Sequence, residues 1–155
     1  MNDIWAPWRI EYINEPKTSG CIFCTATEKN DPLILKRGST CFAIMNRYPY
    51  TGGHCMVVPY RHTADLSSLS VEETIELMSM VNEIMQAMRE TMKTHGFNVG
   101  CNIGAVAGAG ITDHFHMHVV PRWMGDTNFM PVLGDTHVIS EHIMKTRDKI
   151  AGKLP

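Results

Sequence analysis

The chain has 155 residues, a formal net charge of −2 at pH 7 and 44% hydrophobic residues. This length fits a single domain, residues 1–155, and the weak negative charge provides no basic surface for a nucleic acid polymer. No run approaches the roughly 18 apolar residues that a membrane span needs, and the first residues resemble no secretory signal. The odd number of five cysteines predicts free thiols in a reducing cytoplasm.

The first half of the chain predicts an arm followed by a hairpin. Residues 1–20 are expected to form an irregular N-terminal arm, whose tryptophans pack on the domain or on a partner subunit. Residues 40–45 and 54–58 are short apolar segments typical of strands. The glycine-containing turn at residues 49–53 would join them in an antiparallel hairpin, closed by a proline.

A long helix is predicted in the middle of the chain. Residues 70–73, Ser-Val-Glu-Glu, form a capping box, and apolar residues then recur at helical spacing to about His95. Gly96 is a suitable C-terminal cap. The remaining expected elements are a strand at 97–103, a strand at 114–120 and a helix at 140–153. This order predicts an α+β fold with a mainly antiparallel sheet, one long helix and a C-terminal helix.

Three histidines alternate with apolar residues along residues 114–120. On a strand, alternate side chains share a face, so His114, His116 and His118 would form a row supported from behind by apolar residues. A neutral imidazole can attack phosphorus near neutral pH, because its unperturbed pKa is about 6.5. His116 lies between the other two and is the predicted nucleophile. A three-histidine metal site is the alternative, because His-x-His is also a common ligand spacing.

The glycine-rich loop at residues 104–112 directly precedes these histidines. Its small residues let the backbone approach a ligand closely, and its N–H groups can bind an anion. Taken by itself the loop is typical of a tight connection. Beside a row of imidazoles it predicts a phosphate-binding segment.

Cys21 and Cys24 have the spacing of half a zinc site. Two more ligands are needed, and His62 together with one of the three alternating histidines would supply them. A redox pair or two packed thiols are the alternatives. His54 is expected to be a structural histidine.

The alternation at residues 114–120 resembles the pattern of the histidine triad (HIT) family of nucleotide hydrolases and transferases. Residues 44–54 are similar to the nucleoside-binding hairpin of that family, in which Asn46 would contact ribose hydroxyls. Residues 59–62 match the stretch that carries a third zinc ligand in zinc-bearing members. The resemblance implies a HIT-like fold, a homodimer and no organic cofactor. It also implies a structural zinc ion with four ligands: Cys21, Cys24, His62 and His114.

Within that family the chain resembles the diadenosine tetraphosphate phosphorylase branch. Many members carry Gln-Ser or Gln-Thr where Gly110 and Ile111 stand here, whereas residues 102–110 and 120–131 are similar to the phosphorylases. The resemblance implies that His116 forms a nucleotidyl intermediate, which inorganic phosphate then accepts. His118 would hydrogen-bond the phosphoryl oxygens. The residues expected to bind the phosphates are Asn102, Gly104, Gly110 and Thr112.

Two other functions are compatible with these motifs. One is a HIT-type hydrolase that uses water to cleave dinucleotides or nucleoside phosphoramidates. The other is a nucleotide-binding interaction module without useful turnover.

Overall fold

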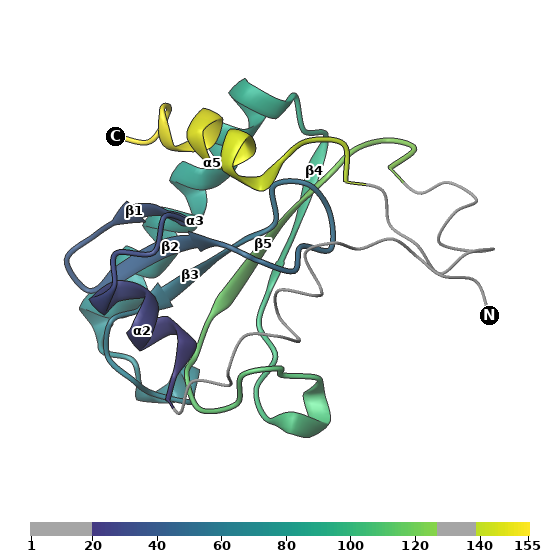
Figure 1. The fold of residues 1–155 in the computed structure, drawn as a ribbon. Coiled ribbons are helices and arrows are strands. Elements are labelled where there is room, and N and C mark those ends of the chain that lie inside the picture. The colour runs from purple at the N-terminus through teal and green to yellow at the C-terminus, as the bar shows by residue number, and fades with distance from the viewer. Residues whose placement is uncertain (1–19, 127–138) are drawn as a thin grey trace.

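The structure is a computed structural model that describes residues 20–126 and 139–155. Five strands form one antiparallel sheet in the order β1-β2-β3-β5-β4 (Figure 1). The strands are β1 (Ile34–Arg37), β2 (Cys41–Met45), β3 (Cys55–Pro59), β4 (Gly96–Gly100) and β5 (Met117–Arg122). The predicted antiparallel sheet and the hairpin of β2 and β3 are therefore confirmed. The predicted N-terminal arm lies, except for its last residue, outside the described residues.

The described part of the chain also contains three helices. They are α2 (Ile22–Glu28), α3 (Val71–Met92) and α5 (Ile143–Ala151), with short 3-10 turns η1 (Leu66–Ser68) and η2 (Ala105–Ala107). The long helix α3 packs on β2, β3 and β5, and α5 packs on α3 and β1. None of the described helices is long and apolar enough to span a bilayer.

The register of the sheet decides which side chains face α3. Cys41 faces the helix, because its Sγ donates to the carbonyl of Glu73 on α3. The pairing of β2 with β3, and of β3 with β5, puts Val57 and Val119 on the same face as Cys41. His118, the next residue along β5, therefore points to the opposite face of the sheet. The face of the sheet without α3 therefore bears His118, one of the candidate site residues.

The capping box begins the long helix as predicted, but the helix ends earlier than expected. Ser70 Oγ accepts a hydrogen bond from the Glu73 amide, and the Glu73 carboxylate accepts one from the Ser70 amide. The helix ends at Met92, and Lys93 takes the left-handed conformation with φ of 52°. Gly96 is not the helix cap, because pairing with Arg122 makes it the first residue of β4.

Other predicted boundaries were also wrong, and strand pairing explains most of the differences. The strand expected at 97–103 ends at Gly100, and the strand expected at 114–120 begins at Met117 and continues to Arg122. The strand passes through Pro121 because β3 pairs with β5 only as far as Val119, so the missing N–H costs no bond on that side. The C-terminal helix is shorter than residues 140–153. Two short elements, α2 and β1, were not predicted.

Candidate functional site

The first two alternating histidines precede the strand. His114 and His116 lie in irregular backbone before β5, and only His118 lies on the strand. The Phe115 amide donates instead to the carbonyl of Thr63, which follows β3. The prediction that all three imidazoles lie on one strand is therefore wrong. Burial of Phe115 is as predicted, but His114 and His116 are also buried, at 1% and 5% exposure.

The rings of His116 and His118 nevertheless lie together, with centroids 4.8 Å apart. Phe23 on α2 contacts the rings of both His114 and His116, at 5.4 Å and 5.1 Å between centroids. Its aromatic ring thus links α2 to the histidine segment and holds these imidazoles against the domain. Packing against Phe23, rather than a regular strand, therefore supports the rings of His114 and His116.

Hydrogen bonds fix which nitrogen of each ring carries the proton. The Tyr50 amide donates to His54 Nδ1 (3.1 Å), so His54 Nε2 carries the hydrogen and donates to His118 Nδ1 (2.9 Å). His118 then presents an Nε2–H donor. His116 Nδ1 donates to the carbonyl of His114 (3.0 Å), which leaves a lone pair on His116 Nε2. The site therefore combines one nucleophilic nitrogen with one neighbouring hydrogen-bond donor.

Burial keeps these rings neutral at physiological pH. It lowers the pKa of His116, and it lowers the pKa of His118 to about 4. Burial, together with repulsion from the protonated forms of His118 and His116, lowers the pKa of His54 to about 3. A neutral imidazole is the form that can attack an electrophile. Burial therefore keeps the His116 ring in the form that can act as a nucleophile.

His54 is the functional residue that the sequence analysis missed, because it was expected to be structural. Its ring is fully buried and orients His118. A signal was available in the hairpin, since His54 directly precedes the strand that pairs with β5. The pairing itself joins residues 64 positions apart, and composition or periodicity does not reveal it.

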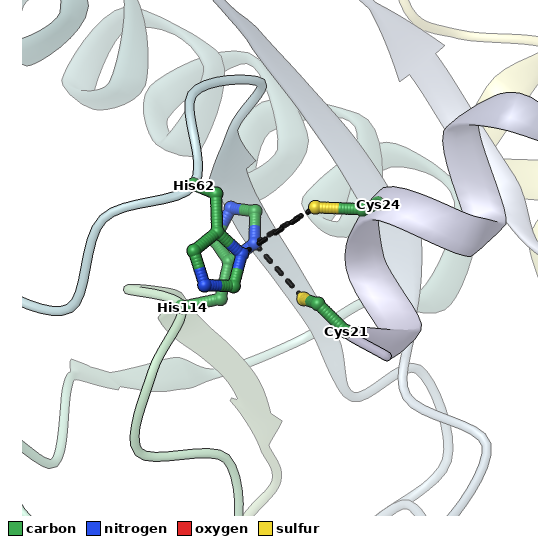
Figure 2. Close-up of side chains that lie close together, drawn as sticks. All are labelled: Cys21, Cys24, His62 and His114. Carbon is green, nitrogen blue, oxygen red and sulfur yellow. Dashed lines mark hydrogen bonds between the residues drawn. The ribbon is translucent and has the colours of Figure 1, made fainter. Parts of the chain in front are cut away.

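Four predicted ligands come together in a Cys/His cluster formed by Cys21, Cys24, His62 and His114 (Figure 2). One candidate ligand atom from each side chain lies within 4.8 Å of the others. His114 Nδ1 lies 3.1 Å from Cys21 Sγ and 3.7 Å from Cys24 Sγ, and His62 Nδ1 lies 3.5 Å from Cys24 Sγ. A tetrahedral zinc site separates sulfur and nitrogen ligands by about 3.5 Å, given the usual Zn–S and Zn–N distances. The donor set and its spacing fit zinc.

The outer nitrogens of the two cluster histidines also have partners. His114 Nε2 donates to the carbonyl of Pro59 (2.9 Å), which leaves Nδ1 as the nitrogen able to bind a cation. His62 Nε2 lies 3.7 Å from a carboxylate oxygen of Asp113. His114 Nδ1 faces the sulfur atoms of Cys21 and Cys24, and its Nε2 faces the Pro59 carbonyl. The ring of His114 is therefore directed at the thiols, whereas His116 Nε2 keeps its lone pair.

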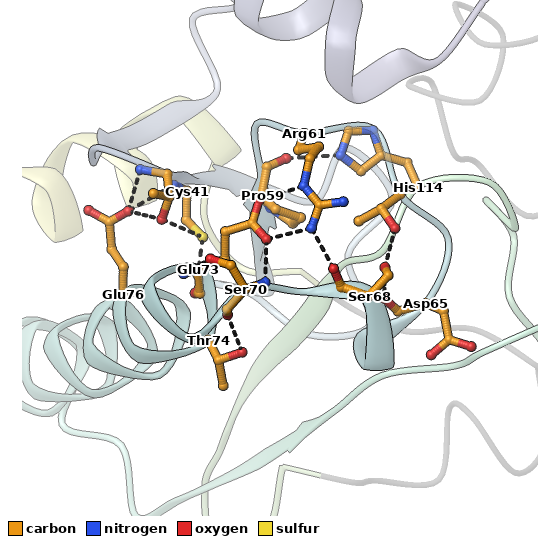
Figure 3. A network of polar contacts seen from close by, with 12 residues as sticks. Cys41, Pro59, Arg61, Asp65, Ser68, Ser70, Glu73, Thr74, Glu76 and His114 are labelled. Atoms are coloured by element: carbon orange, nitrogen blue, oxygen red, sulfur yellow. Dashed lines mark hydrogen bonds and ion pairs between the residues drawn. The ribbon is translucent and has the colours of Figure 1, made fainter.

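A polar network anchors the loop that carries His62 (Figure 3). Arg61 donates to both carboxylate oxygens of Glu73 on α3, at 2.9 Å and 2.6 Å, and to the carbonyl of Ser68. The bidentate geometry ties the segment after β3 to the first turn of α3. The position of the His62 side chain is thus set partly by the N-terminus of the long helix.

The same helix bears a second anchor, the carboxylate of Glu76 (Figure 3). It accepts hydrogen bonds from the amides of Ser39 (2.7 Å), Thr40 and Cys41 (2.9 Å), and from the Thr40 hydroxyl. Burial raises the pKa of Glu76, but these hydrogen bonds outweigh it and lower the pKa to about 2. The ionised carboxylate therefore holds the turn between β1 and β2 against α3.

We expect Glu76→Gln to lower the free energy of unfolding at pH 7 by about 2 kcal/mol, because charge-assisted hydrogen bonds are lost. Since the pKa rises from about 2 in the folded state to 4.5 on unfolding, this stability is complete above pH 4.5 and is lost as the pH falls toward 2. Urea unfolding of both proteins across this range measures the difference. Glu90→Gln, on the exposed end of the same helix, is the control and should change stability by less than about 0.5 kcal/mol. A Glu76→Gln effect that does not diminish toward pH 2 would contradict the argument.

The residues predicted to bind phosphate lie on the loop before His114. Gly104 and Gly108 have positive φ angles of 84° and 87° and flank the η2 turn. The amides of residues 107–109 donate within this turn, and Asn102 donates to the carbonyl of Gly108 (3.3 Å). Gly110 and Thr112 are exposed beyond it. Any phosphate site in the loop must therefore draw on amides outside residues 107–109.

Asn46, the predicted ribose contact, lies at the end of β2 beside His54. Its Oδ1 accepts from the Tyr48 amide (2.9 Å), and its Nδ2 lies 3.3 Å from His54 Nδ1. The side chain thus helps to close the hairpin and borders the histidine chain.

Comparisons with known proteins match these features. Residues 27–124 match a family model described as HIT domain. An AP-4-A phosphorylase from Mycobacterium tuberculosis is 37% identical over 162 residues, covering 97% of this chain and 83% of that protein. An adenosine 5′-monophosphoramidase from Schizosaccharomyces pombe is 28% identical over 103 residues, covering 66% of this chain and 74% of that protein.

A solved structure shares the fold. A Zn-bound histidine triad family protein from Mycobacterium smegmatis superposes with a TM-score of 0.72 at 25% identity, over 86% of this chain and 92% of that one. The HIT-like α+β fold expected from the sequence is confirmed by this match.

Proposed function

The chain belongs to the HIT domain family, and we propose that it is a nucleotidyltransferase that cleaves dinucleoside polyphosphates of the diadenosine tetraphosphate type, with inorganic phosphate as acceptor. The observation that carries the proposal is the paired arrangement of His116 and His118. One ring presents a lone pair on Nε2 and the other an N–H donor, 4.8 Å apart between centroids. The M. tuberculosis relative supports the substrate class.

In the proposed reaction, His116 Nε2 attacks the α-phosphorus of the substrate. A phosphorus–nitrogen bond forms as the bond to the bridging oxygen breaks, and ATP departs from diadenosine tetraphosphate. His118 Nε2–H donates to a phosphoryl oxygen and stabilises the developing charge. An oxygen of inorganic phosphate then attacks the phosphorus, the bond to His116 breaks, and ADP is released.

Nucleotide binding is assigned to two segments near these histidines. Asn46, at the hairpin, would contact the ribose. The loop would bind the phosphates through Asn102, Gly104, Gly110 and Thr112, as the family resemblance implies.

Zinc is proposed as the only cofactor, bound by Cys21, Cys24, His62 and His114. The fit of the four ligand atoms and the Zn-bound M. smegmatis neighbour support this ion. Zinc would hold α2, the loop after β3 and the segment before β5 together, and a closed Cys₂His₂ site keeps no position open for substrate. Its role would therefore be structural.

Two further parts of the proposal concern the state of the protein in the cell. A cytoplasmic location is supported by the five cysteines, all of which are free thiols in the structure. A homodimer is supported by β4, an edge strand whose residues Asn98, Val99 and Gly100 are exposed. Light scattering of the purified chain measures the oligomeric state.

Product analysis distinguishes the proposed reaction from its main alternative. Cleavage of diadenosine tetraphosphate in the presence of phosphate should yield ADP and ATP, and the rate should rise with phosphate concentration. Hydrolysis, for which the S. pombe phosphoramidase relative is the precedent, yields AMP and ATP independently of phosphate. Formation of AMP in place of ADP at high phosphate concentration would refute phosphorolysis. Binding without any turnover would favour an interaction module.

We expect Gly110→Val to weaken binding of phosphate-bearing nucleotides by about tenfold or more while changing adenosine binding little. A branched side chain would block the approach of phosphate to the backbone. The substitution should fold, because a Cβ at Gly110 meets no atom within 4 Å and its φ is not positive. Calorimetric titrations with ADP and adenosine measure the two affinities, and Gly96→Val is the matched control. Equal weakening of both ligands would contradict phosphate binding by this loop.

A further inference from the structure

A groove of about 410 Å³ opens beside His118 on the sheet face that is not covered by α3. Its lining includes His118 and Arg122 of β5, Asn98 and Gly100 of β4, and Tyr50 of the hairpin. His118 to Arg122 spans about 13 Å of strand. The groove is therefore of the size that small ligands occupy, and it begins at a histidine of the reactive pair.

Gly100 keeps the groove deep at the end nearest His118. The two residues are direct partners across β4 and β5. A Cβ at Gly100 would meet no atom within 4 Å, and the residue has no positive φ, so neither packing nor backbone conformation requires glycine here. What glycine provides at this position is open space next to the reactive histidine.

At the far end of the groove, the positive charge of Arg122 is paired with the carboxylate of Asp126. Arg122 donates to both carboxylate oxygens of Asp126 (2.6 Å and 2.9 Å) and to Asn98 Oδ1 (2.9 Å). These bonds hold the guanidinium plane in place and offset its charge. With Asn98 Oδ1 engaged, its amide NH₂ is oriented as a hydrogen-bond donor on an exposed strand.

The lining also includes one aromatic side chain, that of Tyr50. Tyr50 is 57% exposed, and its ring stacks on that of His54 with centroids 4.6 Å apart. Planar groups and amide donors suit a heterocyclic base and its ribose. A polyphosphate chain would instead favour a cation without a bound carboxylate, whereas the lining arginine is already paired with Asp126.

We infer that this groove binds the nucleoside end of the departing nucleoside polyphosphate, and so selects substrates that carry a second nucleoside. The inference rests on the proposed function and deepens it. The transferred nucleotide would react at His116, its phosphate chain would pass His118, and the second nucleoside would lie between Gly100 and Arg122. The groove thus distinguishes a dinucleoside substrate from a nucleotide with the same phosphates.

The test compares two substrates that differ only in the second nucleoside, diadenosine tetraphosphate and adenosine 5′-tetraphosphate. The wild type should have the higher kcat/KM for the dinucleoside. Gly100→Val, which fills the groove without a backbone conflict, should reduce the ratio of the two kcat/KM values by about tenfold or more. Gly96→Val introduces the same side chain on the same strand outside the groove lining, also in open space, and should leave the ratio unchanged. A ratio unaltered by Gly100→Val overturns the inference.

Binding gives a readout that does not depend on turnover. In a His116→Ala protein, the side-chain amide resonances of Asn98 should shift on titration with diadenosine tetraphosphate, and should shift much less with adenosine 5′-tetraphosphate. Equal shifts with both ligands, or none with either, would overturn the assignment of the groove. Failure of turnover together with a selective Asn98 shift would refute the proposed reaction but retain the nucleoside subsite.

Discussion

His116→Ala should abolish cleavage of diadenosine tetraphosphate, with a fall in kcat of several orders of magnitude, as is typical when a covalent nucleophile is removed. The reason is the geometry of this ring: Nδ1 is held by the carbonyl of His114, and Nε2 is left with a lone pair. No neighbouring histidine can replace it. His118 Nδ1 is occupied by His54, and His114 faces the cysteines. Steady-state rates with and without phosphate measure the loss.

Product affinity is the control for this variant. Binding of ADP should survive, because the loop and Asn46 are unaltered. His95→Ala, an exposed histidine outside the site, should retain turnover. Turnover of His116→Ala near the wild-type rate would refute covalent catalysis by this residue. Detection of a nucleotide on His116 by mass spectrometry of the quenched wild type would support it directly.

The local features of this fold were predictable because they depend on neighbours in sequence. The Ser70–Glu73 capping box forms within one turn, and both of its hydrogen bonds are present. Burial of Val119 follows from its alternation with His118 on β5, whereas Phe115 is buried in irregular backbone. The end of the helix was not predictable in the same way, because Gly96 is equally suited to a cap and to a strand, and pairing with β5 decides between them.

The candidate site was predictable only where spacing or family resemblance named its residues. The four cluster ligands were expected, and the structure brings them together. The role of His54 was not, because its partner His118 lies 64 positions later and meets it only through the pairing of β3 with β5. The same holds for the groove at Gly100, which depends on cross-strand register and on a side chain that is absent. The pattern of residues along the chain does not show which distant segments pair in the sheet.

The cluster joins segments that are otherwise held by few elements. Cys21 and Cys24 lie at the start of α2, which has 7 residues and lacks a side-chain cap at its N-terminus. Their contacts with His62 and His114 reach two segments that no strand pairing includes. Burial, followed by the hydrogen bond with Cys21, raises the pKa of the Cys24 thiol, and a bound dication would reverse this by stabilising the thiolate. An ion here would therefore contribute mainly to the stability of this end of the domain.

Cys24→Ser should reduce bound zinc from about one ion per chain to well below that and lower the melting temperature by about 10 °C or more, since binding free energy at a closed site is also folding free energy. Elemental analysis of protein purified without added metal, together with calorimetry, measures both quantities. Cys101→Ser is the matched control, because Cys101 is also a half-buried free thiol but lies outside the cluster. It should leave the zinc content unchanged. Because zinc binding requires deprotonated thiols, the zinc content of the wild type should also fall as the pH is lowered. Wild-type protein that contains no zinc, or that loses it to a chelator without a change in melting temperature, would overturn the structural role and leave Cys21 and Cys24 as ordinary thiols.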